Sequence, residues 1–138
     1  MKSKKISILF ICIALVVSCK VSFVPAFNAS IVADITEGSK MTDALYLHIE
    51  QSPEKNFDLF GEEYIMIETQ INSIILKDQA RPKSGNILTI ANNLKDAFIK
   101  YKTEHKGNDI INSAQAKIYN TYLQAFWKPL LVAETSLK

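Results

Sequence analysis

Apolar side chains recur at steps of three and four from residue 28 to residue 138, which is the spacing of one face of an α-helix. Four stretches follow this period, separated by short segments rich in Pro, Gly, Ser and Asn, and none alternates with the two-residue period of a strand. Four amphipathic helices with short connections predict an all-α fold, namely an up-down-up-down four-helix bundle over residues 28–138.

The first helix is expected over residues 28–50, with Asn28 or Ser30 as its N-cap. Its apolar stripe consists of Ile31, Ile35, Gly38, Thr42, Leu45 and Ile49. Because Gly38 and Thr42 are small, the middle of this stripe is thin. A neighbouring helix can approach closely there, or an apolar small molecule can be held between loosely packed helices.

The second helix is expected to begin at Pro53 with Ser52 as its N-cap, because proline is favoured at the first helical position. Gly61 lies inside this stretch at a cost of about 1 kcal/mol relative to alanine. The turns before Gly61 are therefore expected to be irregular, and residues 62–79 to be helical. The apolar stripe of this helix is Phe57, Phe60, Tyr64, Ile67, Ile71 and Ile74.

A loop over residues 80–86 precedes a third helix, which starts near Ile87 and ends at Gly107 and Asn108. Asn108 is expected to cap the fourth helix, over residues 109–135, and Pro129 to kink its last two turns. The predicted buried face of the fourth helix is Ile111, Ala114, Ile118, Tyr122 and Ala125, with Tyr119, Leu123, Phe126 and Leu130 beside it.

The N-terminal segment has the features of an export signal. Basic residues precede an apolar run over residues 6–17, which is shorter than the roughly 20 residues of a membrane span. The run ends in Val16-Val17-Ser18-Cys19, which resembles the lipobox of a bacterial lipoprotein. This resemblance implies that residues 1–18 are a cleaved signal peptide, that Cys19 carries the lipid, palmitate included, and that residues 19–27 form a tether. Two alternatives remain, a signal cleaved after Val24-Pro25-Ala26 and an uncleaved anchor.

The tether also indicates where the bundle lies relative to the membrane. The eight residues after Cys19 reach at most about 26–29 Å, so the bundle is expected to lie close to the bilayer. Lys20 follows the cysteine, and by analogy with enteric sorting this favours the outer membrane, facing the periplasm, over retention at the inner membrane. Ala80-Arg81-Pro82-Lys83 and Tyr101-Lys102-Thr103-Glu104-His105-Lys106 resemble segments of small uncharacterised Bacteroidota-type lipoproteins. That resemblance implies the same helical fold and adds no activity.

Charge differs between the two halves of the domain. From Cys19 onward 13 basic and 14 acidic residues nearly cancel, which gives no indication of a nucleic-acid partner. Residues 28–79 carry ten acidic and three basic residues, whereas residues 80–138 carry four acidic and nine basic ones. An acidic hairpin is therefore expected to pack against a basic one.

Residue types that carry chemistry are few. Cys12 lies in the leader and Cys19 would be acylated, so no thiol remains in the domain. Neither His48 nor His105 follows a glutamate at the three-residue spacing of di-iron bundles, and His105 is expected to interact with the dipole at a helix end. No metal, no cofactor and no catalytic constellation is predicted, so the chain is interpreted as a non-enzyme.

Two groups of residues are candidates for binding. Lys95, Lys102 and Lys106 line one side of the third helix and form either a solvated stripe or a contact for lipid phosphates or an acidic partner. Phe126, Trp127 and Leu131 form an apolar patch beside Pro129, from which at least one of Trp127 and Leu131 is expected to face outward as a partner anchor. The resulting hypothesis is a lipid-anchored envelope protein that binds a protein partner, and its alternative is a bundle that binds an apolar small molecule.

Overall fold

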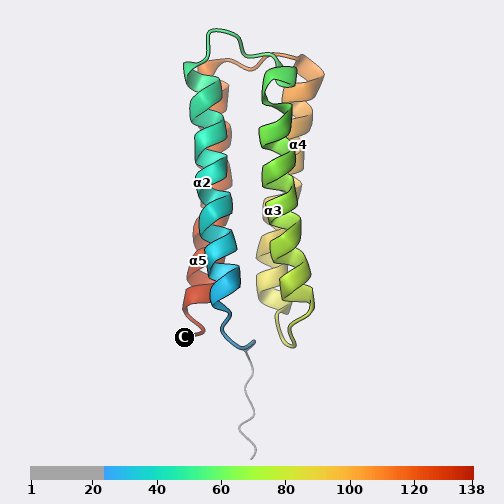
Figure 1. Cartoon of the computed structure of the whole chain (residues 1–138), viewed down its shortest axis with the longest axis vertical. Coiled ribbons are helices and arrows are strands. Elements are labelled where there is room, and N and C mark those ends of the chain that lie inside the picture. Colours follow the sequence, from blue (N-terminus) through green and yellow to red (C-terminus); the bar gives the residue numbers. More distant parts are fainter. Residues whose placement is uncertain (1–23) are drawn as a thin grey trace, which may run out of the picture.

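The computed structural model describes residues 24–138, which form a bundle of four long antiparallel helices (Figure 1). The elements are α2 (Ala29–Gln51), a 3₁₀ turn η1 (Phe57–Phe60), α3 (Gly61–Gln79), α4 (Gly85–Asn108) and α5 (Ser113–Thr135). Helix α2 packs on α3 and α5, and α4 packs on the same two helices, so α2 and α4 lie on one diagonal of the bundle. The predicted four-helix bundle is confirmed. The predicted signal peptide, the predicted lipid-bearing Cys19 and tether residues 20–23 lie outside the described residues.

Helix α2 follows the predicted pattern closely. Asn28 caps it, since its Oδ1 accepts a hydrogen bond from the Ser30 N–H at 2.9 Å. All six members of the predicted stripe are buried, and Tyr46 joins them.

Within residues 24–138, no helix combines the length and the apolar character that crossing a membrane requires.

The connection between α2 and α3 differs from the prediction. Ser52 is the C-cap of α2, and its N–H donates to the His48 carbonyl at 2.9 Å, so it does not cap a new helix at Pro53. The chain then stays outside helical geometry until η1, as expected for the turns before Gly61. The physical reason is a competing partner: the Phe57 N–H donates to the Asp109 carbonyl at 2.8 Å, so this segment pairs with the α4–α5 connection.

The α4–α5 connection also differs. Helix α4 continues through Gly107, and Asp109 ends it with a φ of 60°. Helix α5 begins only at Ser113, because Asn112 and Gln115 form a capping box with bonds of 2.9 and 3.0 Å between each side chain and the other residue's N–H. The prediction that Asn108 caps a helix starting at residue 109 is therefore wrong. Helix α5 then continues past Pro129 to Thr135.

The buried face of α5 also differs from the prediction. The side chains that α5 buries are Ala116, Tyr119, Leu123, Trp127, Leu130 and Glu134. Of the predicted main stripe, only Ile111 is buried, and it precedes the helix, whereas Ala114, Ile118, Tyr122 and Ala125 are exposed. Of the four residues predicted beside that stripe, Tyr119, Leu123 and Leu130 are buried. Both stripes have helical spacing and apolar character, so the period alone does not select between them.

Trp127 and Gly38 explain the choice. The indole of Trp127 lies over Gly38, where an added Cβ would be 2.4 Å from the Cη2 atom. Its Nε1–H donates to Thr42 Oγ1 at 3.1 Å, and that hydroxyl donates to the Gly38 carbonyl at 2.8 Å. The predicted close approach at Gly38 and Thr42 is thus confirmed. The space left by these small residues is filled by Trp127.

Candidate functional site

His105 lies in the last turn of α4, the predicted helix-end position, and it is fully buried there. Its Nε2 lies 2.8 Å from the Lys55 carbonyl and its Nδ1 lies 3.0 Å from the Tyr64 hydroxyl. Because a carbonyl only accepts, the proton is on Nε2, and Nδ1 accepts from the hydroxyl of Tyr64. Phe57 and Phe60 pack against the ring. An imidazole with both nitrogens hydrogen-bonded holds the 52–56 segment onto the bundle.

A buried ionic group lies at the opposite end. The Arg81 guanidinium bonds the carboxylates of Asp78 and Glu134, which are both 0% exposed, and donates to the Ala26 carbonyl at 2.8 Å. Burial raises the pKa of the Glu134 carboxyl, and the Asp78 charge adds to this rise against the opposing effect of Arg81. Burial alone would lower the pKa of Arg81, but its bonds with Glu134 and Asp78 outweigh burial and raise it.

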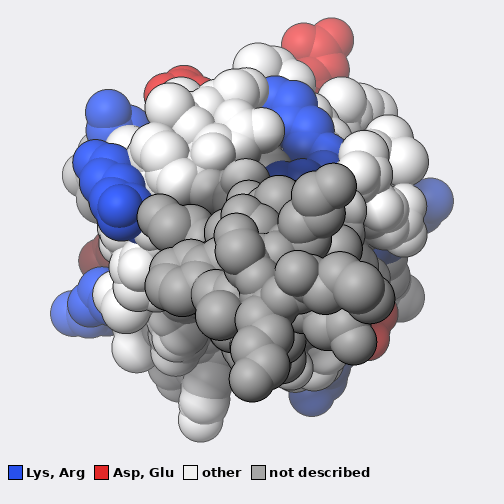
Figure 2. All heavy atoms as spheres, turned by 90° about the horizontal axis from the view of Figure 1, so that it is seen from below, with Lys and Arg blue, Asp and Glu red and all other residues white. Residues whose placement is uncertain are grey.

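This ionic group was missed in the sequence, although a signal was present. Asp78 follows Ile74 and Glu134 follows Leu130 by four residues, so both carboxylates fall on the apolar stripes of their helices. The group joins the end of α3, the end of α5 and the segment before α2. Figure 2 looks onto this end of the molecule, where Lys and Arg side chains lie around the rim with Asp and Glu among them. The described surface there has no large patch of one sign.

Neither buried group provides a set of metal ligands. In residues 24–138, no cluster of three or more His, Cys, Asp or Glu side chains is arranged to hold a metal ion. His48 lies apart from His105, on the surface, with its Nδ1 3.2 Å from Glu63 Oε1. Both histidines are thus hydrogen-bonded to other residues of the bundle.

The predicted basic stripe is not a set of free cations. Lys102 Nζ donates to Glu68 Oε2 at 2.7 Å, which links α4 to α3 and offsets one of the three charges. Lys106 is exposed and Lys95 is half-buried. Lys95 and Lys106 form no ion pair within the described residues, so the stripe as a binding surface stays a prediction.

The predicted anchor patch is also not on the surface. Trp127 is 1% exposed, and Phe126 and Leu131 are half-buried and pack against the core. At least one of Trp127 and Leu131 was expected to face outward, but Trp127 is buried and Leu131 is only partly exposed, because the rotation of α5 that seats the indole over Gly38 turns this patch inward. The same rotation turns another part of α5 outward.

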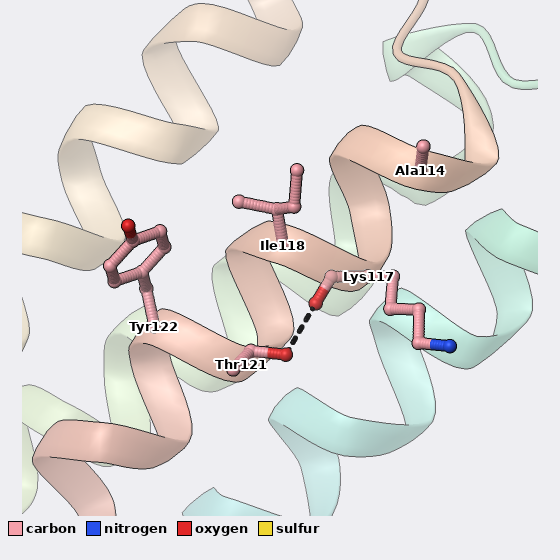
Figure 3. A pocket seen from close by; sticks show the side chains of 5 residues that line it. All are labelled: Ala114, Lys117, Ile118, Thr121 and Tyr122. Atoms are coloured by element: carbon pink, nitrogen blue, oxygen red, sulfur yellow. Dashed lines mark hydrogen bonds between the residues drawn. The ribbon is translucent and has the colours of Figure 1, made fainter.

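That outward part is an apolar stripe formed by Ala114, Ile118, Tyr122, Ala125 and Val132, and it is called the α5 stripe below. Ile118, Tyr122 and Val132 are 51%, 57% and 66% exposed. Figure 3 shows Ala114, Ile118 and Tyr122 along one side of the helix, with Tyr122 reaching toward α4 and Lys117 pointing toward α2. With Lys117 and Thr121 they line an open hollow of about 520 Å³.

The ring of Tyr122 packs against a row of two further tyrosine rings. Its ring centroid lies 6.4 Å from that of Tyr101, which stacks on Tyr119 at 4.3 Å. Burial and the hydrogen bond to Glu104 raise the pKa of Tyr119 to about 12, so its hydroxyl keeps its proton and donates to Glu104 Oε2 at 2.8 Å. Within the α5 stripe, Tyr122 therefore rests against other aromatic side chains.

The charged side chains that α5 itself exposes are basic. Helix α5 carries Lys117, Lys128 and Glu134 as its only charged residues, and Glu134 is buried in the ionic group at the base. Neither lysine forms an ion pair within the described part of the chain. The exposed surface of α5 is thus apolar with a basic border.

Comparison with known proteins gave no further identification: no family model, no curated protein and no solved structure matches the chain.

Proposed function

We propose that this chain is a lipid-anchored cell-envelope protein without catalytic activity, and that it acts by binding a helical segment of a partner protein along the α5 stripe. The observation that carries the proposal is the exposure of that stripe. Helix α5 has two apolar faces, and the bundle buries only one of them. A partner helix would give the second face the cover that the first obtains from α2 and α4.

The magnitudes indicate how such binding would work. Full burial of a large apolar side chain is worth roughly 1.5–3 kcal/mol, so covering the exposed part of Ile118, Tyr122 and Val132 contributes roughly 2–5 kcal/mol in all. Association from free solution costs an estimated 4–15 kcal/mol in lost freedom of movement. Three side chains alone therefore do not hold a partner from dilute solution.

A membrane anchor would supply much of the difference. Two proteins held at one membrane meet at a high effective concentration, which strengthens binding without any new contact. The proposed anchor is a lipid on Cys19, carried by the lipobox-like Val16-Val17-Ser18-Cys19. The Arg81 bond to the Ala26 carbonyl fixes the end of the proposed tether at the base of the bundle, which leaves the long side of α5 free for a neighbour.

The small-molecule alternative has less support. It depended on space beside Gly38 and Thr42, and the Trp127 indole occupies that space. The buried groups around His105 and Arg81 are likewise engaged with other parts of the chain. These observations favour a binding protein whose interior serves only its own fold.

In-cell cross-linking followed by purification of the tagged protein tests this proposal, with the Cys19→Ala variant beside it and the intact mass measured for both. We expect a mass increase of two or three acyl chains on the native product, and one stoichiometric partner that is lost or strongly reduced with Cys19→Ala. An unlipidated native product with no partner would contradict the proposal.

A further inference from the structure

We infer that the partner segment is an acidic amphipathic helix: its apolar side chains cover the α5 stripe, and its flanking Asp or Glu side chains pair with Lys117 and Lys128. This inference rests on the proposed function and specifies the chemistry of the partner at the same site.

The shape of the stripe fits a helix. Ala114, Ile118 and Tyr122 recur every four residues, which is the spacing of the ridges that interdigitate when two helices pack. Ala114 and Ala125 are small and lie on either side of the two large residues, Ile118 and Tyr122. A large apolar side chain of the partner would enter the hollow beside Ala114, and Ile118 and Tyr122 would fill the spaces between the partner's own side chains.

The charges along the stripe determine which charged side chains should flank the apolar face of the partner helix. Lys117 and Lys128 border the stripe on the side nearest α2, both are exposed, and no acidic residue of α5 is exposed beside them. On the side nearest α4, the Lys100 side chain is 66% exposed, and its Nζ is 3.9 Å from Glu104 Oε1. Acidic flanks on the partner would complement these cations, whereas basic flanks would be repelled.

Helix α2 bounds this basic border. Asp43 and Glu50 share a second hollow with Lys117, on the side away from the stripe. The Asn120 side chain donates to Asp43 Oδ1 at 2.7 Å, so that carboxylate already has a partner. An acidic helix placed over α2 would meet these carboxylates, and for this reason the binding position is on the α5 stripe itself.

A second copy of the chain fits this surface less well. Two α5 helices packed about a two-fold axis would bring Lys117 and Lys128 of both copies to the same interface. Helix α5 exposes no carboxylate that could compensate them. The opposing like charges favour a different protein as the occupant.

Site-specific photocross-linking in the producing cells tests the inference on the full chain. A benzoylphenylalanine in place of Thr121 reports on the stripe without removing its apolar residues. Thr69 on α3 is the matched control, because it is also exposed and its hydroxyl makes the same bond to the carbonyl four residues earlier, 2.8 Å in both cases. The cross-linked partner peptide is then sequenced by mass spectrometry.

We expect position 121, and not position 69, to capture one protein through a segment of net negative charge with apolar residues at helical spacing. Charge reversal by Lys117→Glu with Lys128→Glu should lower the cross-link yield about tenfold or more, because acidic flanks would then meet like charge. Lys40→Glu with Lys106→Glu changes the net charge equally, on exposed positions of α2 and α4, and should leave the yield nearly unchanged.

The possible failures are distinguishable. A captured segment of basic or neutral character, or a yield that charge reversal does not change, would overturn the inference and leave the proposed function standing. A peptide from this chain itself would overturn it in favour of self-association. Equal or absent cross-linking at positions 121 and 69 would overturn both the inference and the proposed binding surface.

Discussion

Replacing Gly38 by alanine should destabilise the bundle, although alanine is the better helix former. The new Cβ would lie 2.4 Å from Trp127 Cη2 and 3.1 Å from Cζ2 and Cζ3. Carbon atoms in favourable contact are about 3.5–4.0 Å apart, so the closest pair would overlap by about 1 Å. Trp127 has little freedom to move away, because it is 1% exposed and its Nε1 is bonded to Thr42.

Two opposing terms set the magnitude. Overpacking a core costs typically about 1–3 kcal/mol, and alanine gains about 1 kcal/mol over glycine in a helix interior. Since the closest contact is far inside normal separation, the upper part of the overpacking range applies. The free energy of unfolding of Gly38→Ala should therefore fall by about 1–2 kcal/mol.

Gly107 provides the matched control. It lies in the last turn of α4, and a Cβ added there would meet nothing within 4 Å. Gly107→Ala should therefore be neutral or stabilising by up to about 1 kcal/mol, from helix propensity alone. The two substitutions have the same chemistry and opposite expected signs.

A double-mutant cycle with Trp127→Phe isolates the contact. Phenylalanine lacks the outer indole atoms that meet the new Cβ, so Gly38→Ala should become neutral or stabilising in that background, with a coupling energy of about 2 kcal/mol. Urea unfolding followed by far-UV circular dichroism measures all four proteins. The reasoning is refuted if Gly38→Ala matches the native protein, or if its deficit is the same with Trp127→Phe.

Three further substitutions test the buried polar groups. Arg81→Met leaves two buried carboxylates without their cation and should lower the free energy of unfolding by about 3–5 kcal/mol at neutral pH. The deficit should be smaller below about pH 4, where carboxylates protonate. An equal deficit at both pH values in urea titrations would argue against this role of Arg81. Because the pKa of Glu134 is raised in the folded protein, its ionisation reduces stability as the pH rises from about 4 through that raised pKa. The stability of Glu134→Gln relative to the native protein should therefore increase over this range, and a flat difference would exclude the shift. Tyr64→Phe removes the donor to His105 Nδ1 and should cost about 1–3 kcal/mol by the same unfolding assay; a change within error would show that this bond contributes little.

The sequence predicts the buried face of a helix correctly when that helix has a single apolar stripe, and it fails when there are two. Helix α2 has a single stripe, from Ile31 to Ile49, and its buried face and its N-cap were predicted correctly. Helix α5 has two stripes of equal period, and the one that is buried depends on Gly38 in a distant part of the chain. The sequence pattern grouped four residues of the α5 stripe on one face, Ala114, Ile118, Tyr122 and Ala125, but placed them inside the core.

The predicted boundaries of α3 and α5 were also wrong where contacts between distant segments decide them. Asn112 followed by Gln115 is the pattern of a capping box, and it could have been preferred to Asn108. The pairing of Phe57 with the Asp109 carbonyl joins segments that are far apart in sequence, so no local pattern indicates it. The lipid anchor at Cys19 stays a prediction, because residues 1–23 are not described.

The most direct test of the central claim compares Ile118→Glu with Ile65→Glu in the co-purification experiment. Both isoleucines are exposed, by 51% and 60%, but Ile65 lies on α3, diagonally across the bundle from the α5 stripe. With helicity unchanged in both variants, we expect Ile118→Glu to lose the partner at least tenfold, because a charge would enter the apolar contact, and Ile65→Glu to retain it. Retention of the partner by Ile118→Glu would contradict the assignment of the α5 stripe as the binding surface.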